Sequence, residues 1–434
     1  MTTTYDPSHP QYFEEQDLRK ELERVFDICH GCRLCFNLCP SFPTLFDAVD
    51  AHDGIVAKLT EAEQNKVIDE CYQCKLCYIK CPYIPPHEWA LDFPRMMVRA
   101  TAVFEKNNKK PLSEKFADQF LGRTDLLGRV STTFAPIVNK ISSQRGSLPR
   151  QLMQKSVGIH AERLLPPYAK QRFSSWFKKR SPHPIEAPSQ QVTLFPTCFV
   201  EYMEPQVGKD AVLVLEHNNI ACSLPDKSKC CGAPWLHNGN IDEFVKVASK
   251  NIANLADGVK AGRKIVVTQP TCGYVIRKDY PIYVKTHEAE LVAANTFDLS
   301  EFLMKIHKNP EHKDGLKTDF TGIIPTKIFY HLSCHSRAQN IGYKGRDLLK
   351  LIGAEVETVE RCAGIDGTWG YRQENYELAR KVAQPLKSGL EKSNADCFCG
   401  DCHLANTAMY EETGKMPVHP VSILAQAYGL KDGK

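Results

Sequence analysis

Eight cysteines near the N-terminus form two runs with the same spacing. The runs are Cys29-x2-Cys32-x2-Cys35-x3-Cys39-Pro40 and Cys71-x2-Cys74-x2-Cys77-x3-Cys81-Pro82. Three thiolates at three-residue intervals can reach three irons of one [4Fe–4S] cube, and the fourth, followed by proline, then serves the neighbouring cube. We therefore expect cluster 1 on Cys29, Cys32, Cys35 and Cys81, and cluster 2 on Cys71, Cys74, Cys77 and Cys39. A pair of structural zinc sites is the alternative, but zinc gives no reason for this repeated spacing.

Eight further cysteines belong to an internal repeat in the second half of the chain. LFPTC ending at Cys198 matches FYHLSC ending at Cys334, CCGAPW at Cys230 matches CAGIDGTW at Cys362, and QPTCGYV around Cys272 matches CFCGDCH around Cys399. The overlay predicts a five-cysteine template from which each copy has lost one member, to Val275 in the first copy and to Ala363 in the second. The expected ligand sets are Cys198, Cys230, Cys231 and Cys272 in site 1, and Cys334, Cys362, Cys399 and Cys402 in site 2. Four thiolates can hold a cubane, so the repeats predict one or two further iron–sulfur clusters.

Cys399 and Cys402 allow a second interpretation. An unmetallated Cys-x-x-Cys pair can cycle between dithiol and disulfide. These two residues are therefore the candidate catalytic residues of a thiol–disulfide or heterodisulfide reductase. The following His403 completes a c-type haem attachment motif, but the repeat already explains both cysteines without haem.

Three glycines after Cys362 resemble a phosphate loop but depart from the nucleotide fingerprints. Gly364, Gly367 and Gly370 are better interpreted as positions where backbone N–H groups approach cluster sulfurs. We expect Cys222 and Cys397, which lie outside the template, to be ordinary core residues.

The elements that carry these cysteines predict an α+β protein with a helical first part. Leu18, Leu22, Val25 and Phe26 recur at helical spacing within 14–28, ahead of the first cysteine run. After Gln191, short β-branched runs alternate with amphipathic helices, which is typical of α/β units. The expected organisation is a two-cluster domain at 1–104, a basic amphipathic linker at 105–190, and two repeats at 191–323 and 324–434.

Length and composition set the class of protein. A chain of 434 residues with 42% apolar and 24% charged residues can form two or three globular domains. No segment approaches the ~18 apolar residues of a membrane-spanning helix, and the N-terminus lacks a secretory pattern. We therefore expect a cytoplasmic protein, in which 18 cysteines serve as metal ligands rather than disulfides.

The linker is the basic part of the chain. Between Glu105 and Arg180 there are 16 Lys and Arg against 5 Asp and Glu. Apolar residues recur at helical spacing from Leu126 to Ile141, with Pro136 predicting a fresh helix start, and aromatics alternate with cations from Arg172 to Arg180. Two interpretations stay open, an anionic membrane surface or packing over the chain's own domains. Nucleic acid is not expected, because no binding module is recognisable.

These features together resemble a known family. The paired cysteine runs, the basic linker with TDLLGRVSTTFAPIVNK, the doubled CCG-type motifs and the ending HPVSILAQAYGL are similar to the C subunit of anaerobic glycerol-3-phosphate dehydrogenases and to heterodisulfide-reductase-related iron–sulfur proteins. VFDICHGCRLCFNLCPSFPTLFD resembles the branch found beside rubrerythrin-type proteins.

The resemblance implies an α-helical ferredoxin-like domain followed by a duplicated CCG domain. It also implies electron transfer between a soluble flavoprotein or rubrerythrin-type partner and membrane quinone, at the inner face of the cytoplasmic membrane. In heterodisulfide reductases the complete five-cysteine motif holds a noncubane cluster that cleaves a disulfide. Val275 and Ala363 interrupt that motif in both copies here.

Overall fold

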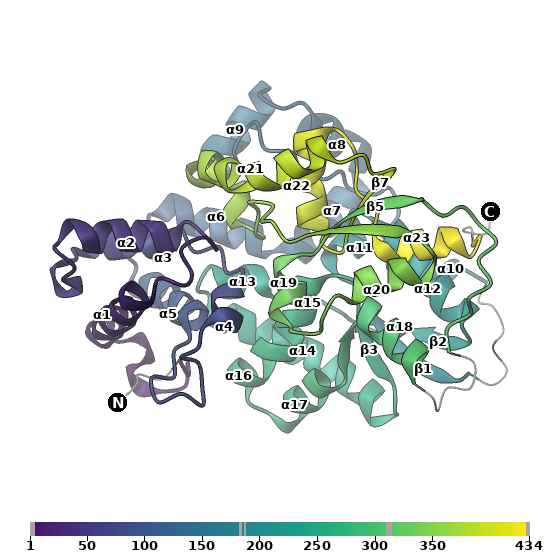
Figure 1. Ribbon diagram of the computed structural model, residues 1–434, viewed down its shortest axis with the longest axis horizontal. Helices are drawn as coiled ribbons and strands as arrows, with labels where there is room; N and C mark the ends of the chain where they lie inside the picture. The colour runs from purple at the N-terminus through teal and green to yellow at the C-terminus, as the bar shows by residue number, and fades with distance from the viewer. Residues whose placement is uncertain (1–4, 182–184, 186–187, 310–314, 431–434) are drawn as a thin grey trace.

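The computed structural model describes residues 5–181, 185, 188–309 and 315–430 (Figure 1). The parts of the expected domains at 1–4, 182–184, 186–187, 310–314 and 431–434 lie outside the described residues. The fold is α+β, with a helical N-terminal part and two α/β repeats. Short 3-10 turns are η1 (Pro10–Phe13), η2 (Val56–Lys58), η4 (Trp369–Tyr371) and η5 (Gln373–Asn375).

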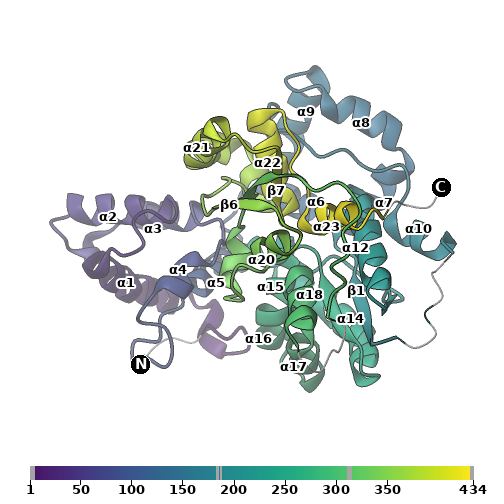
Figure 2. The ribbon, with the colours of Figure 1, turned by 45° about the vertical axis from the view of Figure 1, so that its right-hand side comes forward.

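The N-terminal domain is built from helices around a small apolar core. Its helices are α1 (Glu15–Cys32), α2 (Ser41–Ala51), α3 (Glu61–Asp69), α4 (Leu76–Lys80) and α5 (Phe93–Lys106). The predicted first helix is confirmed, since Leu18, Leu22, Val25 and Phe26 are all fully buried. Thr60 and Glu63 form a capping box that fixes the start of α3. The domain lies at one end of the molecule, in purple and dark blue (Figures 1 and 2).

The basic segment is mostly helical. It forms α6 (Leu112–Gly122), α7 (Thr124–Thr133), α8 (Ala135–Ser143), α9 (Leu148–Val157) and α10 (Phe173–Lys179). Pro136 lies in the first turn of α8, as expected for a helix start. Gly122 lets α6 approach α13 closely, because a Cβ at this position would lie 2.6 Å from the Trp235 ring. The segment is therefore a packed layer rather than an extended linker.

Each repeat has a parallel sheet with the same core order. The first sheet runs β2-β1-β3-β4 and the second β6-β5-β7. The strands are β1 (Gln190–Phe195), β2 (Ile220–Ser223), β3 (Lys264–Val267), β4 (Thr296–Asp298), β5 (Lys327–His331), β6 (Glu355–Val359) and β7 (Cys397–Gly400). The shared order, with β5, β6 and β7 corresponding to β1, β2 and β3, confirms the internal duplication.

Helices cover both sheets. The first repeat contains α11 (Cys198–Tyr202), α12 (Pro205–His217), α13 (Ala233–His237), α14 (Ile241–Lys260), α15 (Pro270–Tyr274), a π-helical turn η3 (Val275–Asp279), α16 (Tyr280–Val284), α17 (His287–Ala294) and α18 (Leu299–Lys308). The second contains α19 (Cys334–Ala338), α20 (Lys344–Leu351), α21 (Tyr376–Lys392), α22 (His403–Thr413) and α23 (Pro420–Ala427). One apolar core includes residues of both repeats, such as Leu194 and Tyr330, so the two copies pack as one body. Over the described ranges, no helix combines the length and apolarity required to cross a bilayer.

Candidate functional site

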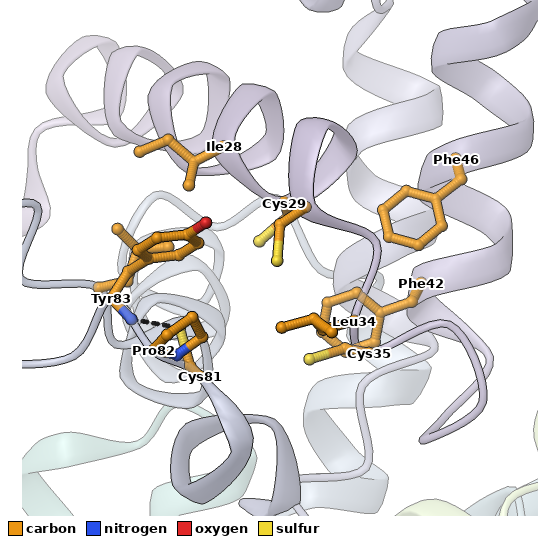
Figure 3. Close-up of a pocket in the computed structure, with 11 residues that line it drawn as sticks. Ile28, Cys29, Leu34, Cys35, Phe42, Phe46, Cys81, Pro82 and Tyr83 are labelled. Carbon is orange, nitrogen blue, oxygen red and sulfur yellow. Dashed lines mark hydrogen bonds between the residues drawn. The ribbon is translucent and has the colours of Figure 1, made fainter.

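The first cysteine quartet encloses a small apolar cavity at one end of α1. Cys29, Cys32, Cys35 and Cys81 line this cavity of about 30 Å³ together with apolar side chains. The thiols of Cys29 and Cys35 point toward Cys81 across one shared space (Figure 3). The backbone N–H of Tyr83 donates a 3.4 Å hydrogen bond to Cys81 Sγ. The structure thus brings together the four residues expected for cluster 1.

The second quartet gathers Cys39 with Cys71, Cys74 and Cys77. Burial raises the pKa of Cys71 to about 11 and that of Cys74 to about 12. Burial also raises the pKa of Cys77 well above its ordinary value, and the charges of Cys74, Cys39 and Cys71 raise it further. These mutual effects show that the four thiols are neighbours, as expected for cluster 2.

The backbone around Cys74 winds tightly. Gln73 and Lys75 both have positive φ, at 54° and 64°, a conformation that costs a non-glycine residue about 1–2 kcal/mol. Lys75 is 3% exposed, and its ammonium group donates to Gln73 Oε1. Backbone strain of this kind concentrates at functional sites, and here it brackets a cysteine of the second quartet.

The quartet of the first repeat is the most tightly associated. Cys198 begins α11 after β1, Cys230 and Cys231 precede α13, and Cys272 lies in α15. Hydrogen bonds from the thiols of Cys198 and Cys231 lower the pKa of Cys230 well below its ordinary value. The N–H of Cys230 donates to Asp125 Oδ2 of α7 at 2.9 Å. All four residues expected for site 1 lie together, and one of them favours the thiolate form that binds metal.

In the second repeat the structure brings three of the four expected cysteines together. Burial raises the pKa of Cys334 well above its ordinary value, and the charges of Cys402 and Cys362 contribute to the same shift. The N–H of Gly364 donates to Cys362 Sγ at 3.3 Å, as expected for a glycine beside a cluster sulfur. Gly364 has a φ of 65°, and a Cβ there would collide with the carbonyl of Ala379.

Cys399 lies elsewhere, and its placement corrects the expected motif alignment. Val192 of β1 pairs with Lys264 of β3, while the equivalent Ile328 of β5 pairs with Cys397 of β7. Cys399 is therefore the counterpart of Val266 rather than of Cys272. Its side chain is fully buried in the apolar core shared by the repeats, whereas Cys402 belongs to a different cluster of side chains. Burial raises the pKa of Cys399 well above its ordinary value, and the neighbouring charges that add to this shift are those of Cys397 and Asp401, not those of Cys334, Cys362 or Cys402.

Single side chains link three of the four groups of cysteines, and the first quartet adjoins the second, since the charge of Cys35 contributes to the raised pKa of Cys77. The thiol of Cys362 lies 3.4 Å from Tyr72 Oη, which follows Cys71 of the second quartet. Trp369 of the second repeat packs on the Tyr72 ring at 5.0 Å between centroids. Gln269 of the first repeat donates to Cys402 Sγ at 3.3 Å. Tyr72 and Gln269 thus connect neighbouring groups, and only their nearness to cysteine motifs could have indicated them in the sequence.

The quartets suit iron–sulfur clusters better than single ions. Each quartet offers four thiols, the number that a [4Fe–4S] cluster takes. Burial raises the pKa of Cys29 and Cys39 well above the ordinary value, so positive charge must be supplied before these thiols bind as thiolates. A bound iron–sulfur cube supplies that charge.

The sequence of the basic segment left two interpretations open, packing over the chain's own domains or docking on an anionic membrane, and different parts of the segment fit each. The aromatics of α10 pack on the shared core, and Phe173 is fully buried. A stripe of apolar residues along α7 and α8, including Phe134 between the two helices, instead faces outward. Those exposed by 44–62% are Leu126, Val130, Phe134, Ile137 and Ile141. Packing over the chain's own domains therefore explains α10 but not this exposed apolar stripe.

Comparison with known families matches the same regions. The Cysteine-rich domain family matches residues 192–277 and 328–408, and the Citrate utilization protein B Fer4-like domain family matches residues 22–106. These matches define an iron–sulfur protein with a helical Fer4-like domain and duplicated CCG domains.

Curated relatives narrow the class further. The chain is 33% identical over 312 residues, 71% of this chain and 76% of the relative, to the C subunit of anaerobic glycerol-3-phosphate dehydrogenase of Escherichia coli K12. It is 27% identical to the B subunit of fumarate reductase (CoM/CoB) of Methanothermobacter marburgensis, over 55% of this chain and 46% of the relative. It is also 27% identical to lactate utilization protein A of Shouchella clausii, over 49% of this chain and 87% of the relative. The chain belongs to the family of the anaerobic glycerol-3-phosphate dehydrogenase C subunit, whose members are iron–sulfur electron-transfer subunits of oxidoreductases.

Proposed function

We propose that this chain transfers electrons between a redox partner protein and membrane quinone. The observation that carries this proposal is that Tyr72 and Gln269 link the second quartet to the cysteine groups of the two repeats. When bound, iron–sulfur clusters supply one-electron carriers along such a series. The partner is a flavoprotein dehydrogenase or a rubrerythrin-type protein. This assignment of the partner rests on the sequence resemblance to the C subunit of anaerobic glycerol-3-phosphate dehydrogenases and to the rubrerythrin-associated branch. Because no nucleotide fingerprint is recognisable in the sequence, a flavin is expected in the partner.

The proposed ligand sets follow the gathered thiols. Cluster 1 is held by Cys29, Cys32, Cys35 and Cys81, and cluster 2 by Cys39, Cys71, Cys74 and Cys77. In the repeats the sets are Cys198, Cys230, Cys231 and Cys272, and the incomplete group Cys334, Cys362 and Cys402. Burial of these thiols excludes water, and the N–H of Gly364 stabilises negative charge on Cys362.

Metal analysis of anaerobically purified protein tests this assignment. We expect about 12 to 16 irons per chain, with matching sulfide and several cluster signals in electron paramagnetic resonance of the reduced protein. About 8 irons would confine clusters to the N-terminal quartets. Bound zinc and a colourless protein would refute the proposal.

We further propose that the exposed stripe of α7 and α8 docks on an anionic membrane from the cytoplasmic side. Support comes from the outward-facing apolar residues together with the excess of Lys and Arg in the same segment. Apolar side chains enter the acyl boundary while cations meet lipid phosphates. Membranes washed at rising salt should release part of the protein, and release that is independent of ionic strength would contradict the electrostatic contribution.

The alternative is a heterodisulfide or thiol–disulfide reductase acting at the second repeat. This alternative needs Cys399 and Cys402 to form a reactive pair. Cys399 is fully buried in the core shared by the repeats, and the charges that shift its pKa are those of Cys397 and Asp401, not that of Cys402. We therefore prefer electron transfer. If the pair were catalytic, Cys399→Ser would abolish disulfide reduction while the N-terminal clusters stayed reducible.

A further inference from the structure

The cysteine quartet of the first repeat opens into a large apolar cavity. This cavity measures about 370 Å³, against about 30 Å³ at the first N-terminal quartet. Its walls away from the cysteines are apolar, formed by Phe120, Leu127, Val138, Met153, Ile159 and Leu165. The extra space exceeds what a thiol-bound cluster occupies, and an apolar lining favours an apolar ligand over water.

One histidine brings polar chemistry to this apolar wall. His237 lies at the end of α13 with its side chain 6% exposed, and its Nδ1 is 3.2 Å from Asp366 Oδ2. Its Nε2 is buried without a hydrogen-bond partner among the described residues. An unpartnered buried nitrogen costs about 1–3 kcal/mol, so a histidine held in this way is suited to a ligand oxygen.

The same pair forms part of a second, polar cavity. This cavity of about 200 Å³ is lined by His237 and Asp366 and, farther out, by Lys110, Glu114 and Glu374. His237 and Asp366 therefore separate an apolar cavity beside cysteine thiols from a polar cavity with titratable side chains. A side chain at such a boundary can receive a proton on one side and release it on the other.

We propose that the apolar cavity binds the ring of a quinone and that His237 donates a proton to its carbonyl oxygen, held in position by Asp366. This inference rests on the proposed function, in which the redox partner supplies the electrons. Reduction of the quinone takes two electrons and two protons, and each carbonyl oxygen gains one hydrogen. His237 delivers one of the two protons from Nε2 to the carbonyl oxygen that it faces, becomes neutral with Nδ1–H directed at Asp366, and is reprotonated from the polar cavity. The second carbonyl oxygen, on the opposite side of the ring, takes its proton from solvent.

Binding of duroquinone to the oxidised holoprotein tests the site without relying on turnover. Every ring carbon of duroquinone is substituted, so it does not add to thiols, and durene has the same shape without the two carbonyl oxygens. Equilibrium dialysis should show duroquinone bound about tenfold more tightly than durene, as one additional hydrogen bond implies. His237→Phe should abolish this preference while durene still binds, and His237→Gln, which retains an N–H donor, should keep part of it.

The control is His307→Phe, which changes a histidine of α18 that lines neither cavity. This variant should keep the full preference for duroquinone. Equal binding of duroquinone and durene to the unmodified protein, or an unchanged preference in His237→Phe, would overturn the inference. Iron is measured in each preparation, because iron-loaded protein without the preference refutes this site alone, whereas protein without iron refutes the proposed function.

Discussion

Removal of two apolar side chains from the exposed stripe should detach the protein from membranes. Phe134 and Ile137 are 54% and 62% exposed, on the adjoining ends of α7 and α8. Full burial of such a side chain is worth about 1.5–3 kcal/mol, so inserting the exposed portions of both contributes about 2–3 kcal/mol. The double substitution Phe134→Ser and Ile137→Ser should therefore weaken vesicle binding by about 30- to 160-fold.

Co-sedimentation with vesicles of phosphatidylglycerol and phosphatidylcholine measures this partition coefficient. The control is Ile323→Ser, because Ile323 is 75% exposed but lies outside the basic segment. This control should bind vesicles like the unmodified protein. Equal sedimentation of the double variant and the unmodified protein would refute the membrane assignment. So would a protein that dimerises through α7 and α8 in solution and does not bind vesicles.

Three further substitutions test particular contacts. Cys399→Ser should leave the iron content unchanged, whereas Cys402→Ser should lower it. Iron analysis of both variants measures this, and a loss of iron in Cys399→Ser would show that Cys399 is a ligand. Arg99→Met removes a fully buried guanidinium that donates hydrogen bonds to two backbone carbonyls and a carboxylate. The substitution should lower the free energy of unfolding, measured in urea, by about 3 kcal/mol. An unchanged midpoint of urea unfolding would contradict this. Burial raises the pKa of Asp298 to about 7, so the folded chain holds a proton there that the unfolded chain releases near pH 4. Stability should fall by up to about 4 kcal/mol as pH rises from 4 to 7, and Asp298→Asn should flatten that slope.

The helical parts of the fold followed from local patterns. Apolar spacing predicted α1, and Pro136 predicted the start of α8, because both signals act within one or two helical turns. The duplication was visible because cysteine-bearing strand ends recur in both copies. Each of these features depends on residues close together in the chain.

The position of Cys399 was beyond the sequence because it depends on strand register. β3 ends at Val267, five residues before Cys272, whereas β7 ends at Gly400, two residues before Cys402. An overlay guided by cysteines cannot detect this difference in loop length, and it paired a strand residue with a helix residue. The exposure of Phe134 was equally hidden, because periodicity gives an apolar face to a helix without indicating what covers it.

The two repeats differ in what packs against them, and that difference gives them different roles in the proposed function. α4 and Tyr72 of the N-terminal domain lie against α19 and Trp369, beside the cysteines of the second repeat. α6 and α7 lie against α13 and α11, beside the cysteines of the first repeat. The second repeat is thereby enclosed between protein groups that carry cysteines, while the first faces helices that leave a cavity and present an apolar stripe outward. Duplication of a domain alone would give two equivalent sites. Because different elements pack against the two repeats, the site of the second repeat becomes an internal connection. In the proposed function the site of the first repeat is then the end of the series, where a membrane-borne acceptor has access.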